Sequence, residues 1–384
     1  MPALLAGSAN FIVDEDPAYE PVGDGEHLYL HLEKEGIATD ALADALAKAF
    51  GKRPSDIGYA GRKDRHAIAR QWFSVHFGDE ARLANLPEHL RHGRVAVLRT
   101  GRHRNKIRLG HLAGNRFRLR LGGASDWEPV RAALARLAHE GIRNRFGTQR
   151  FGRNQATLRC ARAWGAGDWR GAVAAIVDAD DRWRFGDALP EGFRPGPEGR
   201  VLGYLRKKPE DARGALVATG DQMRKLVASA AQSAVFNAIA DAREALSLTH
   251  RLRLGDLGLN AKGAPFLVEA DRLDDTNLRA APGSLQAFAS APLPGTSTLR
   301  PAPAIDAEER TWAEPTGIDW SWLDAKGPLE SPGERRALVV PFRAPPQLIA
   351  EGDQAWLELS LPPGTYATEV LDQCGVTVPD DRRG

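Results

Sequence analysis

A short strand, turn and helix near the end of the sequence constrain the fold more than any other feature. The segment AWLELSL (355–361) alternates apolar and polar residues, which predicts a strand. The segment PPGTYATEVLDQC (362–374) predicts a turn and a short helix, with Thr365 as the expected N-cap. A stretch of this length cannot bury a core of its own. We therefore predict that it completes a sheet begun earlier, and that the middle of the chain is an insertion.

The first 140 residues predict the sheet that this segment would join. HLYLHLE (27–33) places three leucines on one face, which predicts a half-buried strand. A helix is expected over 39–50, ending at Gly51. QWFSVHF (71–77) and RFRLRL (116–121) alternate again, and 127–140 is expected to be helical. This order of elements predicts an α+β fold.

The middle of the chain differs from the first 140 residues in its pattern of predicted helices and loops. Helices are expected over 158–164 and 221–245. The stretches 180–215 and 281–334 are rich in Pro and Gly, so loops or linkers are expected there. A chain of 384 residues is long enough for two or three domains, or for one domain with a large insertion.

The net charge of +2 indicates little about partners, but the distribution of charge is informative. Residues 91–121 contain ten Lys or Arg and no acid, and residues 141–167 contain six Arg and no acid. Such clusters are typical of a basic patch that contacts nucleic acid. The alternative interpretation is a set of solvated charged faces.

Several classes of protein and site are not supported. Cys160 and Cys374 supply neither a disulfide framework nor a cysteine zinc site. The first residues do not resemble a signal peptide, and no stretch approaches the roughly 18 apolar residues of a membrane span. We expect a cytoplasmic protein with no membrane partner. The sequence has no GxxxxGK or HExxH motif, and His27 and His31 have no clustered partners in sequence, so no metal site is predicted.

One carboxylate among cations is the strongest candidate for chemistry. In GYAGRKDRHAIARQWFSV (58–75), Asp64 lies between Arg62, Lys63 and Arg65, on a connection that leads into a strand. One interpretation is an ordinary surface ion pair. The other is a carboxylate that neighbouring cations keep ionised, as a nucleophile or electrostatic stabiliser at a sugar carbon requires.

Two further groups of residues have two interpretations each. Phe117 is either a core residue or a ring that stacks on a base. Arg143, Arg145, Arg150 and Arg153 belong either to a solvated loop or to a phosphate-binding surface.

Seven segments in order resemble the TruD family of tRNA pseudouridine synthases. The segment around Asp64 resembles the family's AG-x-KD signature followed by a QW strand. IRLGHLAGNRFRLRL (107–121) is similar to its GN-x-F segment, and NRFGTQRFG (144–152) to its N-x-FG-x-QRFG motif. The other four matching segments are ANFIVDED (9–16), GDGEHLYLHLEKEGIATDALADALAKAFG (23–51), SAAQSAVFNAIADAR (229–243) and LPPGTYATEVL (361–371).

The resemblance implies an α+β pseudouridine synthase fold with a mixed, mainly antiparallel sheet and an inserted α/β domain of the TRUD type. It implies a catalytic domain formed by residues 1–140 and 339–384, with the inserted domain over 141–338. It also implies that the protein isomerises uridine to pseudouridine in tRNA, at position 13 of the D-arm, on a flipped-out nucleotide. No cofactor and no obligate protein partner are implied. The alternatives are a pseudouridine synthase for another RNA, or an RNA-binding or folding protein with secondary catalysis.

The resemblance also assigns site residues. It implies that Asp64 is the catalytic aspartate and that Lys63 has a local electrostatic role. The positions expected to bind substrate are Phe11, Asn115 and Tyr366, the last at a site where an aromatic residue, often Phe, is usual. Phe117, Glu15 and Gln149 match positions with supporting roles, and Arg150, in the arginine-rich loop, is expected to contact substrate.

Overall fold

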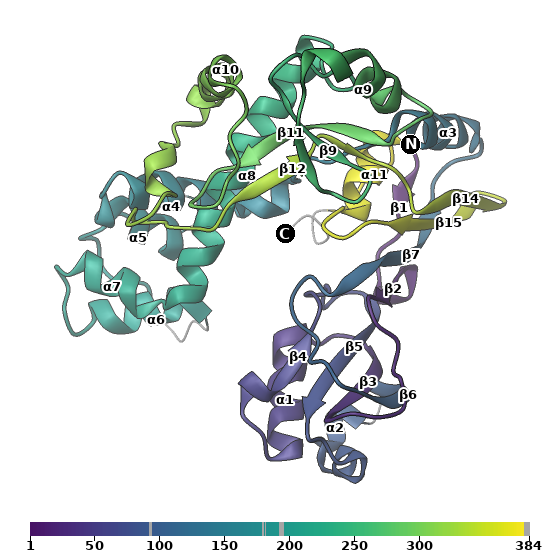
Figure 1. The fold of residues 1–384 in the computed structure, drawn as a ribbon. Coiled ribbons are helices and arrows are strands. Elements are labelled where there is room, and N and C mark those ends of the chain that lie inside the picture. The colour runs from purple at the N-terminus through teal and green to yellow at the C-terminus, as the bar shows by residue number, and fades with distance from the viewer. Residues whose placement is uncertain (92–93, 179, 181, 192–195, 380–384) are drawn as a thin grey trace. The chain divides into compact units, whose positions relative to one another are not determined.

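The structure is a computed structural model that describes residues 1–91, 94–178, 180, 182–191 and 196–379. The chain divides into two compact units (Figure 1). The first contains Met1–His139 and Pro341–Arg382, and the second contains Glu140–Val340. The first unit is therefore made from two separate parts of the sequence.

A nine-stranded sheet forms the centre of the first unit. Its strand order is β14-β15-β7-β2-β5-β3-β6, with β1 also paired to β7 and β4 to β5. β2 and β5 are parallel, and the other strand pairs described in this sheet are antiparallel. The sheet is mixed and mainly antiparallel, as predicted. The elements of this unit are β1 (Ala3–Leu4), β2 (Phe11–Pro17), β3 (His27–Lys34), α1 (Thr39–Phe50), β4 (Ile57–Tyr59), β5 (Ile68–His76), α2 (Glu88–Arg91), β6 (Val95–His103), β7 (Leu112–Gly122), α3 (Glu128–Glu140), β14 (Ala344–Glu351), β15 (Gln354–Leu361) and α11 (Ala367–Gln373).

The late strand joins the early sheet. β15 pairs with β7 in an antiparallel register that runs from Gln354 opposite Gly122 to Leu361 opposite Asn115. This pairing confirms the prediction that the strand over 355–361 completes a sheet begun earlier. The predicted N-cap was wrong, because Tyr366 is the residue that precedes the first turn of α11, and its side chain makes no capping hydrogen bond.

The main core of the first unit lies between α1 and one face of β3 and β5 (Figure 1). Leu46 and Phe50 of α1 pack against the leucines of β3 and against Phe73. α1 ends where predicted, because Gly51 takes the left-handed conformation with φ of 62°. β3 is not half-buried as predicted, since Tyr29 on its other face is only 1% exposed. The reason is its place between β5 and β6, where Tyr29 packs in a second cluster with Trp72.

The second unit combines helices with a four-stranded antiparallel sheet of order β10-β9-β11-β12 and a two-stranded pair of β8 and β13. Among the described residues, no helix is both long enough and apolar enough to cross a membrane. The elements are β8 (Ile142–Arg143), α4 (Ala156–Gly165), α5 (Trp169–Val177), α6 (Gly196–Leu205), α7 (Ala212–Ala218), α8 (Asp221–Ala245), β9 (Leu257–Asn260), β10 (Pro265–Leu267), α9 (Leu273–Ala280), β11 (Ala287–Leu293), α10 (Pro303–Ala313), β12 (Glu334–Ala337) and β13 (Val339–Val340).

Two stretches predicted as loops contain regular structure. α6 and most of α7 lie in the 180–215 stretch, while β11 and α10 lie in 281–334. The Pro and Gly residues that suggested loops lie partly at the starts of these elements. Pro303 is the first residue of α10, where its missing N–H costs no intrahelical bond. Asp211 caps α7 by accepting a hydrogen bond from the N–H of Gly214.

Candidate active site

Asp64 lies on the exposed turn between β4 and β5. Its carboxylate oxygen Oδ1 accepts a hydrogen bond from the backbone N–H of His66 at 2.9 Å. This local bond orients the carboxylate and leaves the side chain accessible to a substrate.

A buried lysine lies directly beneath this turn. Nζ of Lys34 donates hydrogen bonds to the carbonyls of Ile37 at 2.8 Å, Asp64 at 3.2 Å and Lys63 at 3.3 Å. Lys34 is only 1% exposed. Burial lowers the pKa of Lys34 to about 8, and the nearby charge of Asp64 opposes that shift. Lys34 therefore fixes the backbone of the turn and places a cation close to Asp64.

A second set of hydrogen bonds joins the turn to α1 and β5. The N–H of Lys63 donates to Oγ1 of Thr39 at 2.9 Å, and this hydroxyl donates to Oε1 of Gln71 at 2.8 Å. Nε2 of Gln71 donates to the carbonyl of Gly61 at 3.0 Å. Thr39 and Gln71 are buried. Because buried polar groups of this kind are costly to leave unpaired, they restrict the turn to one conformation.

Two of the three cations that flank Asp64 in sequence form ion pairs with other acids. Nζ of Lys63 lies 2.5 Å from Oε2 of Glu15, and Arg62 lies 3.0 Å from Asp40. Burial raises the pKa of Glu15, while the charge of Lys63 opposes that shift. The sequence pattern suggested that the flanking cations keep Asp64 ionised. In the structure the cation that lies beneath the turn is Lys34, 30 residues away in sequence, and the charge of Asp64 acts on it.

Glu15 and Asn115, two polar residues of the candidate site, lie in one row across the sheet. Glu15 of β2 is opposite Asn115 of β7, and Asn115 is opposite Leu361 of β15. Within the part of the chain that the structure describes, Oδ1 of Asn115 is buried without a hydrogen-bond partner. Gly114 is required beside it, because a Cβ there would lie 2.5 Å from the carbonyl oxygen of Leu361. Tyr366 follows the turn after β15 and is half-buried.

Two aromatic rings lie on the same strands. Phe11 and Phe117 contact each other edge to face, with ring centroids 6.0 Å apart. Phe11 is buried, whereas Phe117 is half-buried and lines a surface pocket together with Arg116 and Arg118. The ring of Phe117 therefore has both a packing contact and an accessible part.

Replacing Phe117 with Ala separates these two roles. We expect turnover to fall by more than the loss of stability accounts for, because the accessible part of the ring is available to stack on a base at about 1–3 kcal/mol per base. Steady-state kinetics and a thermal melt on the same sample measure both effects. A large drop in melting temperature with unchanged kinetics at a lower temperature would assign Phe117 to packing alone.

Gln149 and Arg150 lie in the second unit, on a 3-10 helix formed by Thr148–Phe151. Gln149 is exposed. The guanidinium of Arg150 donates hydrogen bonds to the hydroxyls of Ser233 and Ser229 on α8 and lies over the ring of Phe146. Arg150 thus stabilises the loop against α8, in addition to any contact it makes with substrate.

Both arginine-rich segments contain many ion pairs. On β7, Arg116, Arg118 and Arg120 alternate with apolar residues as predicted, but each has an acid nearby. Those ion pairs are Arg116–Asp16 at 3.0 Å, Arg118–Glu358 at 3.5 Å and Arg120–Glu351 at 2.9 Å. In the second unit the pairs are Arg143–Glu244, Arg145–Asp241 and Arg153–Asp180. The positive potential of these surfaces is therefore weaker than the sequence runs suggest.

Sequence reasoning did not identify Lys34 or Gln71 as part of the site. For both residues the sequence contained a signal, namely a polar residue at a core-facing position of a predicted strand. Lys34 continues the alternation of Leu28, Leu30 and Leu32, so it occupies a position expected to face the core. Gln71 shares its face of β5 with Phe73 and is fully buried. A polar residue at a core-facing position requires internal partners, which indicates a structural or functional role.

Comparisons with known proteins agree with this architecture. A family model described as tRNA pseudouridine synthase D (TruD) matches residues 4–184 and 184–374. The tRNA pseudouridine synthase D of Geobacter metallireducens is 37% identical over 388 residues, covering 94% of this chain and 92% of its own. That of Geobacter sulfurreducens is 36% identical over 391 residues, covering 94% and 91%. The solved TruD structure from Methanosarcina mazei has a TM-score of 0.69 at 25% identity, covering 97% of this chain and 94% of its own.

The mixed sheet and these matches define the class of the protein, an α+β enzyme of the pseudouridine synthases, which are isomerases. Within this class the chain belongs to the TruD family. The resemblance that the sequence motifs indicated is confirmed.

Proposed function

We propose that this protein converts uridine to pseudouridine at position 13 in the D-arm of tRNA, with Asp64 as its catalytic carboxylate. The single observation that carries the assignment of Asp64 is its placement. The carboxylate is exposed, while the turn beneath it is fixed by the buried side chains of Lys34, Thr39 and Gln71. A catalytic group needs this combination of access and fixed position.

The reaction suits a site with one accessible carboxylate. The bond between N1 of uracil and C1′ of the ribose breaks, and a bond between C5 and C1′ forms. The hydrogen leaves C5 and N1 gains one, so atoms and electrons balance without a cofactor. A carboxylate can attack the sugar, attack the base, or remove a proton from the sugar, and all three routes need an ionised Asp64. Glu15, the neighbouring acid, is buried and paired with Lys63, which suits it to positioning.

The other residues of the candidate site in the first unit have binding roles in this proposal. The amide oxygen of Asn115 has no hydrogen-bond partner among the described residues, so we assign it to accept a hydrogen bond from the substrate. Tyr366 and Phe117 provide rings for the base or for an unstacked neighbour. Phe11 supports Phe117 by its edge-to-face contact. A uridine must leave its stack to reach Asp64, at a cost of a few kcal/mol that these contacts offset.

We further propose that the first unit is the catalytic domain and the second the inserted TRUD-type domain. The predicted boundaries, 1–140, 141–338 and 339–384, are part of this proposal. Gln149 and Arg150 are assigned to tRNA contact by the inserted domain. The reaction needs tRNA as its only macromolecular partner and takes place in the cytoplasm.

The test is a direct assay of the product and its position. The purified protein is incubated with an unmodified tRNA transcript that carries uridine at position 13, and pseudouridine is mapped by a carbodiimide-dependent stop of reverse transcription. We expect a stop that reports position 13 and is absent in the transcript with cytidine at that position. Stops only at other positions, or only in other RNAs, would replace this substrate with another RNA. Salt-sensitive binding without any product would favour an RNA-binding or folding protein.

Replacement of Arg150 with Ala tests the role of the second unit. We expect RNA binding to weaken more than the chemical step slows, because the proposed interaction is with phosphate. The slope of log affinity against log salt should become shallower by about 0.7–0.9 for each phosphate that the protein no longer neutralises. Arg251→Ala is the matched control, since Arg251 is an exposed arginine of the same unit. An unchanged slope with a lower melting temperature would restrict Arg150 to its bonds with α8.

A further inference from the structure

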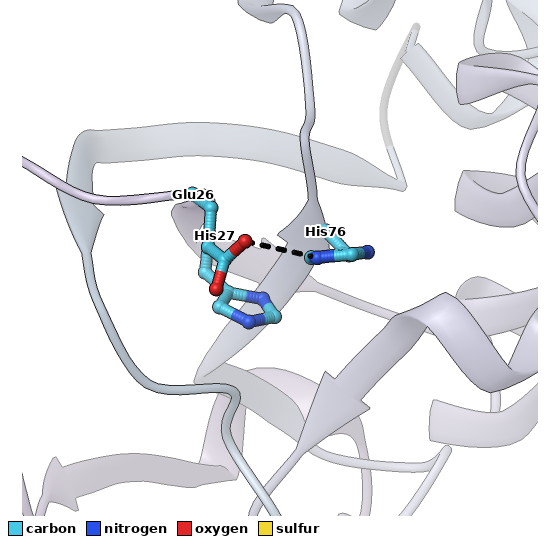
Figure 2. Close-up of side chains that lie close together, drawn as sticks. All are labelled: Glu26, His27 and His76. Carbon is cyan, nitrogen blue, oxygen red and sulfur yellow. Dashed lines mark hydrogen bonds and ion pairs between the residues drawn. The ribbon is translucent and has the colours of Figure 1, made fainter.

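Three potential metal ligands meet at the end of the sheet where β3 begins and β5 ends. His27 is the first residue of β3, His76 is the last residue of β5, and the two are directly opposite in the antiparallel register. Glu26 precedes His27. Figure 2 shows the three side chains pointing toward one another, with the Glu26 carboxylate next to the ring of His76.

The distances are close to those of a metal site. Oε2 of Glu26 lies 3.4 Å from Nε2 of His76, and one ligand atom from each of the three residues lies within 4.8 Å of the other two. In a tetrahedral zinc site with bonds of about 2.0–2.2 Å, ligand atoms are roughly 3.3–3.6 Å apart. Small side-chain rotations would bring all three atoms to that separation.

His27 provides an independent sign of a missing partner. The residue is 7% exposed, and among the described residues no group forms a hydrogen bond with its Nδ1. A buried imidazole nitrogen without a partner is costly. A neutral imidazole nitrogen of this kind is a common metal ligand.

We infer that Glu26, His27 and His76 bind a divalent transition-metal ion of the zinc class. Two imidazoles and one carboxylate are a ligand set that Zn²⁺ uses, with a fourth position left for water. Glu26 and His76 are partly exposed, with side-chain exposures of 49% and 39%, so an ion can enter from the solvent side. Because the ligands include no thiolate, Co²⁺ and Ni²⁺ should also bind.

The backbone fixes the two exposed ligands relative to each other. The N–H of Phe77 donates to the carbonyl of Glu26 at 2.6 Å, which joins the residue after His76 to Glu26. Phe77 has a φ of 45°, in the left-handed region that is unfavourable for a non-glycine residue, and its ring packs on His76 with centroids 4.4 Å apart. The local backbone thus maintains the arrangement of Glu26 and His76.

Two neighbouring groups affect the proposed site: His103 bears on the number of protein ligands, and Lys106 bears on the strength of binding. His103 is opposite His27 on β6, but its Nδ1 accepts a hydrogen bond from the N–H of Asn105, and its ring stacks on Tyr29. The charge of Lys106 lies near His27. This charge opposes a cation, so we expect binding weaker than at a four-ligand structural zinc site.

The site is remote from Asp64. The connection carrying Asp64 leads into the start of β5, whereas His76 is at the far end of this nine-residue strand, roughly 25–30 Å away along the strand. An ion there would join the ends of β3 and β5 and stabilise the folded chain by binding to it alone. It has no part in the proposed isomerisation, so the two proposals can fail independently.

The experiment uses the full chain without a histidine tag, freed of metal with a chelator. Co²⁺ is added in steps, and the visible absorption bands that report a tetrahedral N/O site are followed. We expect one Co²⁺ per chain, displaced by Zn²⁺, and a rise in melting temperature with Zn²⁺ that EDTA reverses. His76→Ala and Glu26→Gln change partly exposed side chains, so both variants should fold. Loss of a direct ligand should weaken Co²⁺ binding by more than about tenfold, since changes around a site already cost about 10–100-fold.

His139→Ala is the matched control, because His139 is an exposed histidine on α3, and it should bind Co²⁺ as the unaltered chain does. Two results would overturn the inference. One is the absence of any Co²⁺ band and of any Zn²⁺-dependent change in melting temperature in the unaltered chain. The other is Co²⁺ binding that His76→Ala and Glu26→Gln leave unchanged, which would place the ion elsewhere.

Discussion

Replacing Asp64 with Asn is expected to lower pseudouridine formation by about 10³-fold or more, the scale on which enzymes respond to loss of a central catalytic group. Asn has the same shape, and its amide oxygen can still accept the hydrogen bond from the N–H of His66. The turn should therefore remain folded while the negative charge is lost. The measurement is single-turnover formation of pseudouridine in the tRNA transcript.

Two controls make this result specific. RNA affinity and melting temperature of Asp64→Asn should match those of the unaltered chain, since the side chain is exposed. Asp44→Asn removes another exposed carboxylate from the same unit, on α1, and should retain normal turnover. Normal turnover by Asp64→Asn and Asp64→Ala would remove Asp64 from the mechanism and require another residue to carry the reaction.

Replacing Lys34 with Met is expected to produce the second largest effect. The three part-buried carbonyls that Lys34 contacts would lose their donor, and a hydrogen bond to a charged group contributes about 1.5–3 kcal/mol to the free energy of unfolding. The turn would also become less ordered, and the cation near Asp64 would be absent. We expect kcat to fall by more than about tenfold even well below the melting temperature, because small displacements of a catalytic group cost rates of this size or more.

The split between kcat and KM distinguishes a positioning role from a purely structural one. A positioning residue should lower kcat with KM little changed, whereas partial unfolding would lower the amount of active enzyme and the melting temperature together. Lys48→Met, on the exposed side of α1, is the matched control and should change neither quantity. If Lys34→Met keeps normal kcat at a temperature where it is folded, Lys34 serves stability only.

The pH dependence of stability tests the burial of Lys34. Its pKa is about 8 in the folded chain, below the ordinary value of 10.5. Between these two pH values the unfolded chain binds more protons than the folded chain, so the free energy of unfolding contributed by Lys34 rises with pH. The difference in unfolding free energy between the unaltered chain and Lys34→Met should therefore grow from pH 8 to 10.5, by up to about 1.4 kcal/mol per pH unit. A difference that stays constant over this range would show that the pKa of Lys34 is not lowered.

The sequence alone was sufficient for the class of the protein and for much of the first unit. Alternation of apolar residues predicted β3, β5, β7 and β15, because strand periodicity is a local property of the chain. The helical spacing of apolar residues, which is also a local property, predicted α1 with Gly51 as its end. Motifs in family order identified the TruD family and the candidate site. Sequence patterns failed at 180–215 and 281–334, where the positions of Pro and Gly within or between elements depend on packing.

Tertiary structure decided which side chains act on one another. The sequence placed cations next to Asp64, but in the structure Arg62 and Lys63 pair with Asp40 and Glu15, and Lys34 lies beneath the turn instead. Arginine-rich runs that suggested open basic surfaces contain many ion pairs with acids from other elements. Electrostatic interactions depend on distance in space and on burial, and neither is a property of adjacent positions in the chain.

His27 also shows that neighbours in sequence do not reveal neighbours in space. In sequence it had no clustered partners, and no metal site was predicted. The antiparallel register of β3 and β5 places His76, 49 positions later, directly opposite His27, with Glu26 beside them (Figure 2). Local sequence therefore determined which segments form strands and helices. The packing of α1 on the sheet and the pairing of the strands determined the environment of Asp64, and strand pairing brought these three ligands together, because both join residues that are distant in sequence.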